Sequence, residues 1–328
     1  MYIITGGAGF IGSVVWSRLN QLGHKDIWVV DSLRSNDKYR NMIGKHSWDY
    51  SHKSDFLNLI QTGQISKRVN PKDIKGIIHM GACSSTFQLD SDYLMQNNYE
   101  YSKVLCNFAL EHGIRFIYAS SAATYGAGND GYNDDHAQLN SLCPLNPYGF
   151  SKHLFDLWLA QHQLLDQVVG LKFFNVYGPN EYHKDEQRSV ICKAYLEAQI
   201  SKSVALFKSY HPDYKDGESK RDFIYVKDCA EAIIALLQQP EANGIFNLGT
   251  GKARSWLDLA RALLKSMDLP EKIIFKDMPE VLRGRYQYFT EANMSKFNQL
   301  KLPVQFHSLE DGVEDFVRNY LQSESKIF

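Results

Sequence analysis

Short apolar runs alternate with amphipathic segments over the first half of the chain. Each apolar run is short enough for a strand, and each amphipathic segment has the spacing of a helix with one buried face. Such alternation predicts right-handed βαβ units, and hence an α/β fold with a doubly wound parallel sheet and helices on both faces. The predicted strands are Tyr2–Ile4, Ile27–Val30, Gly76–Met80, Arg115–Ala119 and Val169–Phe174, and the predicted helices are 10–23, 55–61, 92–111 and one beginning at Pro147.

The second half of the chain is less regular. Apolar runs at Val204–Phe207, Phe223–Val226 and Ile245–Leu248 predict further strands among longer loops, which indicates a smaller C-terminal domain. Residues 211–220 are polar and predict a loop or hairpin. We expect a dinucleotide-binding domain over 1–170, with later segments near 221–250 returning to it. Residues 176–328 should form mainly a substrate-binding domain.

Composition narrows the functional classes. The chain has 328 residues, of which 44% are hydrophobic and 22% are charged, as in ordinary globular proteins. A net charge of −1, from 36 basic and 37 acidic residues, provides no general field for binding nucleic acid. No apolar stretch is long enough to cross a membrane, and no leader precedes the first strand. We therefore expect a cytoplasmic protein with no nucleic-acid or membrane partner.

Cysteine and histidine spacing predicts neither disulfides nor a metal site. The five cysteines are scattered and never form a C-x-x-C pair. For Cys83, a small buried thiol is a better interpretation than a nucleophile. The histidines also lack the spacing of metal ligands.

A glycine-rich segment, Gly6-Gly7-Ala8-Gly9-Phe10-Ile11-Gly12, joins the first strand to the first helix. Glycines let the backbone turn tightly and approach a pyrophosphate, which then lies on the free N–H groups of the helix N-terminus. Asp31 ends the second strand about 20 residues later, where a carboxylate can accept hydrogen bonds from an adenosine ribose. Together these features predict a Rossmann-type dinucleotide site.

The choice between NAD and NADP rests on opposing charges. The carboxylate of Asp31 favours NAD, because it repels a 2′-phosphate. Arg34, Lys38 and Lys53 could offset this repulsion by binding the phosphate.

Tyr148 and Lys152 provide the strongest chemical signal. Their i, i+4 spacing on a helix places the phenol and the ammonium on one face, with Cβ atoms roughly 6 Å apart. A fixed cation there should lower the pKa of the phenol from about 10, so that the phenolate can accept a proton from an alcohol. Because ligands of open α/β sheets bind at the carboxyl ends of strands, Ser121 should meet Tyr148 there.

The order of glycine turn, strand-end acid, Ser121 and Tyr-x-x-x-Lys resembles the extended short-chain dehydrogenase/reductase superfamily. The resemblance covers nearly the whole chain, including Phe174–Pro179 and Arg221–Val226. It implies that Ser121 hydrogen-bonds the reacting hydroxyl, that Tyr148 is the acid/base, and that Lys152 also holds the nicotinamide ribose. Ser121-Ala122-Ala123 stands where a 4,6-dehydratase usually has Thr-Asp-Glu, so dehydration is not favoured.

Four segments of the sequence are more specific than the general superfamily pattern. They resemble the ADP-L-glycero-D-manno-heptose 6-epimerase family, an isomerase of lipopolysaccharide core biosynthesis. The resemblance implies a tightly bound, catalytic NADP, with NAD less favoured, and a hydride that leaves carbon 6 of ADP-heptose and returns to its other face. It also implies a second acid/base at Lys184 and a homo-oligomer, a pentamer in the family. The runs are Gly81–Thr86, Asn97–Lys103, Tyr118–Gly126 and Gly284–Thr290.

Further site residues follow from the same resemblance. Arg221 stands where related epimerases hold the substrate diphosphate. The chain departs from the family at 185–188 and between Phe207 and Arg221, where its polar segment is longer. The expected substrate contacts are Ser121, Asn175, Lys193, Phe207, Arg221 and Tyr286; the expected cofactor contacts are Gly6, Gly9, Phe10, Ile11, Gly12, Asp31, Ser32, Lys38, Lys53, Met80, Gly81, Ala82, Cys83, Asn97, Tyr148, Lys152, Val176 and Lys184.

Two alternatives stay open. A 4-epimerase or reductase of another nucleotide sugar would keep Ser121, Tyr148 and Lys152 but would not need Lys184. A dinucleotide-sensing protein without catalysis is the other alternative, although a sensor needs no activated phenol.

Overall fold

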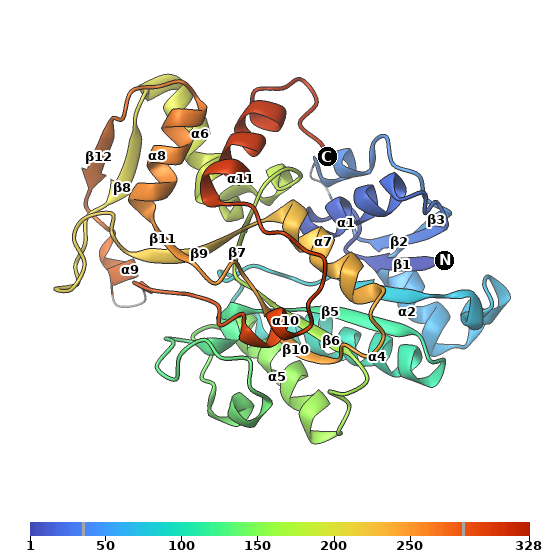
Figure 1. Ribbon diagram of the computed structural model, residues 1–328. Coiled ribbons are helices and arrows are strands. Elements are labelled where there is room, and N and C mark those ends of the chain that lie inside the picture. The colour runs from blue at the N-terminus through green and yellow to red at the C-terminus, as the bar shows by residue number, and fades with distance from the viewer. Residues whose placement is uncertain (35–36, 284–285) are drawn as a thin grey trace.

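A seven-stranded parallel sheet organises the described residues of the computed structural model, which are 1–34, 37–283 and 286–328 (Figure 1). The strands are ordered β10-β6-β5-β4-β1-β2-β3, and every neighbouring pair is parallel. The predicted doubly wound α/β fold is therefore confirmed. The strands are β1 (Tyr2–Thr5), β2 (Ile27–Asp31), β3 (Asp49–His52), β4 (Gly76–His79), β5 (Arg115–Ser121), β6 (Val169–Phe173) and β10 (Gly244–Leu248).

Helices cover both faces of this sheet because successive residues of a strand point to opposite sides. Ile4, Val29 and Ile117 belong to the core that α1 (Phe10–Gln21) and α7 (Val226–Leu237) share. Their neighbours Ile3, Trp28 and Phe116 belong to the opposite core. The helices on that second face are α2 (Lys53–Gln61), α4 (Tyr101–Glu111) and α5 (Pro147–Gln161).

The helix expected over 92–111 is interrupted. It begins as α3 (Ser91–Leu94), continues as a π-helical turn over Met95–Glu100 and becomes α4. Within the turn, the buried Asn98 amide accepts from the Cys83 N–H at 2.8 Å. It also donates to the Cys83 carbonyl and to Ser151 Oγ, each at 2.9 Å. A π-helical turn thus accompanies a buried amide that ties α5 to the loop after β4.

Two small sheets lie beside the large one (Figure 1). The first contains β7 (Asn175–Tyr177), β9 (Lys220–Tyr225) and β11 (Ala253–Ser255), and the second pairs β8 (Val204–Phe207) with β12 (Ile273–Lys276). The segment predicted as a loop or hairpin is a loop between β8 and β9. The remaining helices are α6 (Val190–Ser201), α8 (Trp256–Ser266), α9 (Glu280–Arg283), α10 (Ser295–Gln299) and α11 (Leu309–Phe316).

The domain limits stay a prediction. Of the segments expected to return to the first domain, β10 joins the large sheet and α7 packs on it, whereas β9 belongs to a small sheet. The first two residues of the Gly284–Thr290 run lie outside the described residues. Among the described helices, none is long and apolar enough to span a bilayer.

We expect Phe116→Ala to lower the free energy of unfolding by about 3–5 kcal/mol, because the ring is 0% exposed and its removal leaves a cavity. The matched control is Phe87→Ala, where the ring is 71% exposed and the change should stay within about 0.5 kcal/mol. Urea denaturation followed by circular dichroism measures both. Equal losses in the two variants would contradict the assignment of Phe116 to the core.

Candidate active site

The glycine-rich turn joins β1 to α1 in a space that admits no side chain. Gly6 has a φ of +67°, and a Cβ at this position would lie 2.6 Å from the Gly81 nitrogen. A Cβ on Gly12 would lie 2.3 Å from the Gly6 carbonyl oxygen. Helix α1 begins after Gly9, which provides no side-chain cap, so its first N–H groups are available to an anion. The turn therefore has the features of a phosphate cradle.

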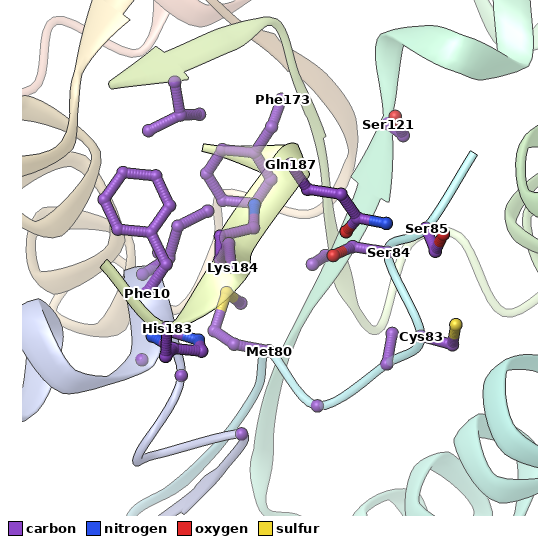
Figure 2. Close-up of a pocket in the computed structure, with 18 of the residues that line it drawn as sticks. Phe10, Met80, Cys83, Ser84, Ser85, Ser121, Phe173, His183, Lys184 and Gln187 are labelled. Carbon is purple, nitrogen blue, oxygen red and sulfur yellow. The ribbon is translucent and has the colours of Figure 1, made fainter. Parts of the chain in front are cut away.

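A cavity of about 670 Å³ opens beside this turn at the carboxyl ends of β1, β4 and β5 (Figure 2). It lies where the strand order reverses, between β1 and β4, which is the usual ligand position in open α/β sheets. Figure 2 shows Phe10, Met80 and Lys184 toward one side of it and Ser85 and Ser121 toward the other. All eighteen predicted cofactor residues line the cavity, as do two predicted substrate residues, Ser121 and Asn175.

The other four predicted substrate residues lie elsewhere. Arg221, on β9, is 7% exposed, and its guanidinium carbon lies 5.2 Å from the Tyr286 ring centroid and 5.8 Å from that of Trp256. Trp256 lines the cavity, whereas Arg221 and Tyr286 do not. Lys193 Nζ donates to the Glu186 carbonyl at 3.1 Å. The Phe207 ring lies 5.4 Å from Lys276 Nζ.

Backbone N–H donors and a lysine compensate the negative charge of the Asp31 carboxylate. One oxygen accepts from the Ala8 N–H at 2.9 Å, and the other accepts from the Ser32 N–H at 2.6 Å and pairs with Lys38 Nζ at 2.5 Å. Lys53 Nζ, in the same cavity, donates to Asn97 Oδ1. The negative charge of Asp31 therefore stands among cations, which reduces its repulsion of a phosphate.

The prediction that Lys152 lowers the pKa of Tyr148 is wrong for the chain by itself. Burial raises the pKa of Tyr148, and a hydrogen bond with Ser121 opposes this shift only in part. Lys152 is 5% exposed, and burial lowers its pKa to about 8. The sequence spacing identified the pair, but desolvation depends on the surrounding fold.

Lys184 lies in a short 3-10 helix, Tyr182–Gln187. Its ammonium is 5.3 Å from the centroid of the Phe10 ring. Burial lowers the pKa of Lys184, whereas Glu181 acts in the opposite direction. Asp185 follows at a φ of 47°, a conformation that strains a residue with a side chain. Lys184 is therefore a half-buried amine and not a solvated surface group.

Sequence reasoning missed several parts of the cavity wall. Cys83 lines the cavity as expected of a cofactor contact, but its thiol is half-buried and not buried, and all five cysteines are free. Ser84 and Ser85 follow a strand, a position that could have indicated them. No group of three potential metal ligands occurs in residues 1–34, 37–283 and 286–328. Other lining residues not predicted are Thr5, Val30, Tyr101, Ala119, Ser120, Phe173, Phe174, Tyr177, His183, Gln187, Arg188, Ser189, Val190, Ile191, Phe223, Trp256 and Leu259.

Comparisons with known proteins agree with this geometry. The model of the NAD dependent epimerase/dehydratase family matches residues 2–249. The ADP-L-glycero-D-manno-heptose-6-epimerase of Nitratidesulfovibrio vulgaris (strain DP4) is 53% identical over 98% of both chains. That of Fusobacterium nucleatum is 46% identical over 99% of both.

Solved structures extend the likeness to the fold. The Helicobacter pylori ADP-L-glycero-D-manno-heptose-6-epimerase has a TM-score of 0.80 at 28% identity, covering 97% of this chain and 95% of that one. The Thermotoga maritima UDP-glucose 4-epimerase has a TM-score of 0.77 at 23% identity, covering 96% and 97%. The second comparison concerns the fold alone.

We expect Gly12→Ala to weaken dinucleotide binding by at least about tenfold, because the new Cβ would push against the Gly6 carbonyl and widen the phosphate cradle. Quenching of tryptophan fluorescence during titration with NADPH measures the dissociation constant. Gly113→Ala is the control, since a Cβ there meets nothing within 4 Å. Unchanged affinity in a folded Gly12→Ala protein would contradict the assignment of the cradle.

Proposed function

Since the chain belongs to the NAD dependent epimerase/dehydratase family and to the ADP-L-glycero-D-manno-heptose-6-epimerases, we propose that it inverts carbon 6 of ADP-D-glycero-D-manno-heptose. The observation that carries this proposal is a shared cavity. Ser121, Tyr148, Lys152 and Lys184 all line the cavity that contains the glycine turn. An epimerase of this kind needs a dinucleotide and acid/base groups in one enclosure. This cavity has a glycine turn that could bind the dinucleotide and side chains that could act as the acid/base groups.

The residues present fit a dinucleotide. The turn excludes side chains where a pyrophosphate would lie, and Asp31 lies at the end of β2, where an adenosine ribose would be held. When bound, the dinucleotide supplies a group that accepts a hydride and returns it. We assign it as NADP, because Lys38 pairs with Asp31, and Lys53 interacts electrostatically with Asp31, Arg34 and Lys38 in the same cavity. Mass spectrometry of the nucleotide released from purified protein tests this choice, and NAD alone would overturn it.

The chain's own residues would handle the proton. Ser121 would hold the carbon-6 hydroxyl by a hydrogen bond, and Tyr148 would exchange its proton at the phenolic oxygen. Burial lowers the pKa of Lys152 to about 8. Below that pH the Lys152 ammonium would orient the ribose and stabilise the phenolate.

Inversion places the substrate oxygen in a second position. Rotation about the bond between carbons 5 and 6 of the oxidised sugar would bring the oxygen to that second position and present the opposite face of carbon 6. Lys184, whose pKa is lowered by burial, would exchange the proton in that second position. The net reaction has no redox change, so a single retained dinucleotide would suffice.

Other parts of the functional interpretation stay predictions. These are the substrate contacts of Asn175, Lys193, Phe207, Arg221 and Tyr286, the homo-oligomer and its pentameric form, and the cytoplasmic location. The Arg221 guanidinium donates to the Lys220 and Gln287 carbonyls, and it would have to leave these bonds to reach a substrate diphosphate.

The decisive experiment incubates the purified protein with ADP-D-glycero-D-manno-heptose and no added cofactor. We expect NMR to show an equilibrium mixture of the two carbon-6 epimers. UDP-galactose, offered in parallel, should remain unchanged. Conversion of UDP-galactose without conversion of the heptose would instead identify a 4-epimerase, and no conversion of either would favour the non-catalytic alternative.

Lys184→Met should lower the rate of carbon-6 inversion by about 100-fold or more, because it removes one of two proton-exchanging groups. The same NMR assay measures the rate. Lys265→Met, at an exposed position on α8, is the matched control and should keep the wild-type rate. A Lys184→Met protein with wild-type turnover would remove Lys184 from the mechanism.

A further inference from the structure

A buried ion pair joins α5, the helix that carries Tyr148 and Lys152, to strand β6. Lys172, on β6, and Asp156, on α5, place Nζ and Oδ2 3.3 Å apart, and both side chains are at most 1% exposed. Burying two charges costs several kcal/mol per ion before their attraction offsets it, so such a pair rarely adds stability over apolar residues. The position of this pair suggests a different role.

Asp156 connects α5 to the strand that carries Ser121. Its Oδ1 accepts from the Tyr118 hydroxyl at 2.8 Å, and its Oδ2 accepts from Ser120 Oγ at 2.8 Å. Both donors lie on β5, and Ser120 immediately precedes Ser121. Asp156 also lies one helical turn beyond Lys152 and therefore on the same face of α5.

Lys172 holds Ser121 from its other side. Its ammonium donates to Thr124 Oγ1 at 2.6 Å, and Thr124 Oγ1 donates to the Ser121 carbonyl at 2.8 Å. The ammonium also lies 4.6 Å from the centroid of the Tyr125 ring. The two partners of the ion pair thus bond the side chains of residues before and after Ser121, and Thr124 links one of them to the Ser121 carbonyl.

We propose that the Asp156–Lys172 pair positions Ser121 and Lys152 for the proton exchange with the substrate hydroxyl. Neither residue lines the cavity, so both are positioning residues and not catalytic ones. The proposal rests on the proposed function for the identity of the reaction. This network of hydrogen bonds would keep the Ser121 hydroxyl, on β5, and the Lys152 ammonium, on α5, at a fixed separation.

The charges around the pair determine the expected pH effect. The groups that act on Asp156 or respond to it are Lys152, Lys172, Tyr118, Tyr125, His136 and His153. Lys152 also interacts with Cys83 and His79. Burial has the largest effect on Lys152, and the net result is a pKa of about 8. Of the groups that oppose this lowering, the Asp156 carboxylate has the largest effect.

Asp156→Asn keeps the shape of the side chain and removes its charge. We expect kcat for heptose inversion to fall by about 10-fold to 100-fold with KM nearly unchanged, because positioning is lost but the binding surface is not. The pKa of Lys152 should fall further without the carboxylate. The alkaline limb of the kcat profile should therefore move to lower pH, by about one unit.

Lys172 provides the second variant pair. Lys172→Met removes the ammonium and should also lower kcat. Lys172→Arg keeps the positive charge and should have a kcat close to that of the wild type. Should Asp156→Asn fail to fold, this comparison decides the proposal. A kcat for Lys172→Met equal to that of Lys172→Arg would overturn it.

Asp228→Asn is the matched control for burial. Asp228, on α7, is 1% exposed and pairs with His307 Nδ1 at 2.5 Å, away from the cavity lining. The Asp228→Asn substitution should lower the melting temperature but leave the pH profile of kcat unchanged. A wild-type profile in Asp156→Asn, or the same shift in Asp228→Asn, would overturn the proposal.

A binding measurement separates this proposal from the proposed function. The affinity for NADPH, followed by tryptophan fluorescence from pH 6 to pH 10, requires no sugar substrate. In Asp156→Asn the loss of affinity at high pH should begin at lower pH than in the wild type. If the wild type fails to invert ADP-heptose but this shift appears, the proposed function fails and the positioning role stands. If inversion occurs and neither profile shifts, only the positioning role fails.

Discussion

The close approach of two backbone segments, at Gly6 and Gly81, determines where the site can form. Gly6 donates its N–H to the Val30 carbonyl at 2.8 Å, while Gly81 donates to Thr5 Oγ1 at 3.2 Å. A Cβ on Gly6 would lie 2.6 Å from the Gly81 nitrogen, so no other residue fits. This contact joins the ends of β1, β2 and β4 at the point where the strand order reverses. The cavity, the cradle and the position of Asp31 all depend on it.

Buried charge is compensated throughout the site. Asp31 is paired with Lys38, and Lys152 lies one turn from Asp156, which is itself paired with Lys172. An uncompensated charge at such depth would change its protonation state or destabilise the fold. Because of this compensation, the ammonium groups of Lys152 and Lys184 and the phenol of Tyr148 can share one cavity. The pKa of Lys152 stays at about 8, close to the pH range in which enzymes work.

Local features of the sequence predicted most of the fold and the cofactor side of the site. Continuous apolar runs identified the central strands, and the eighteen expected cofactor residues gathered in one cavity because most of them lie at a strand end, just after a strand or in a nearby helix. Strand β3 was missed because Asp49–His52 is too polar to resemble a strand, and only pairing with β2 makes it one.

Features that depend on tertiary contacts could not be predicted. The π-helical turn accompanies the hydrogen bonds of Asn98 to Cys83 and Ser151, which no periodicity reveals. The raised pKa of Tyr148 results from burial, a property of the assembled cavity. Asp156 and Lys172 look like ordinary polar residues in the sequence and become an ion pair only when α5 packs against β5 and β6.

The two proton-exchanging groups of the proposed reaction are supported in different ways. Tyr148 lies on α5, which Asn98 and the Asp156 network tie to the sheet. Lys184 lies in a short 3-10 helix that Asp185 interrupts with a φ of 47°. A reaction that reuses one dinucleotide requires the first group to stay fixed against the cofactor, whereas the second must meet the oxygen after it has moved. A rigid helix suits the first role, and a segment outside the sheet can vary with the sugar without disturbing the hydride geometry. For this chain, a substitution near Lys184 should therefore disturb the hydride geometry less than a substitution near Tyr148.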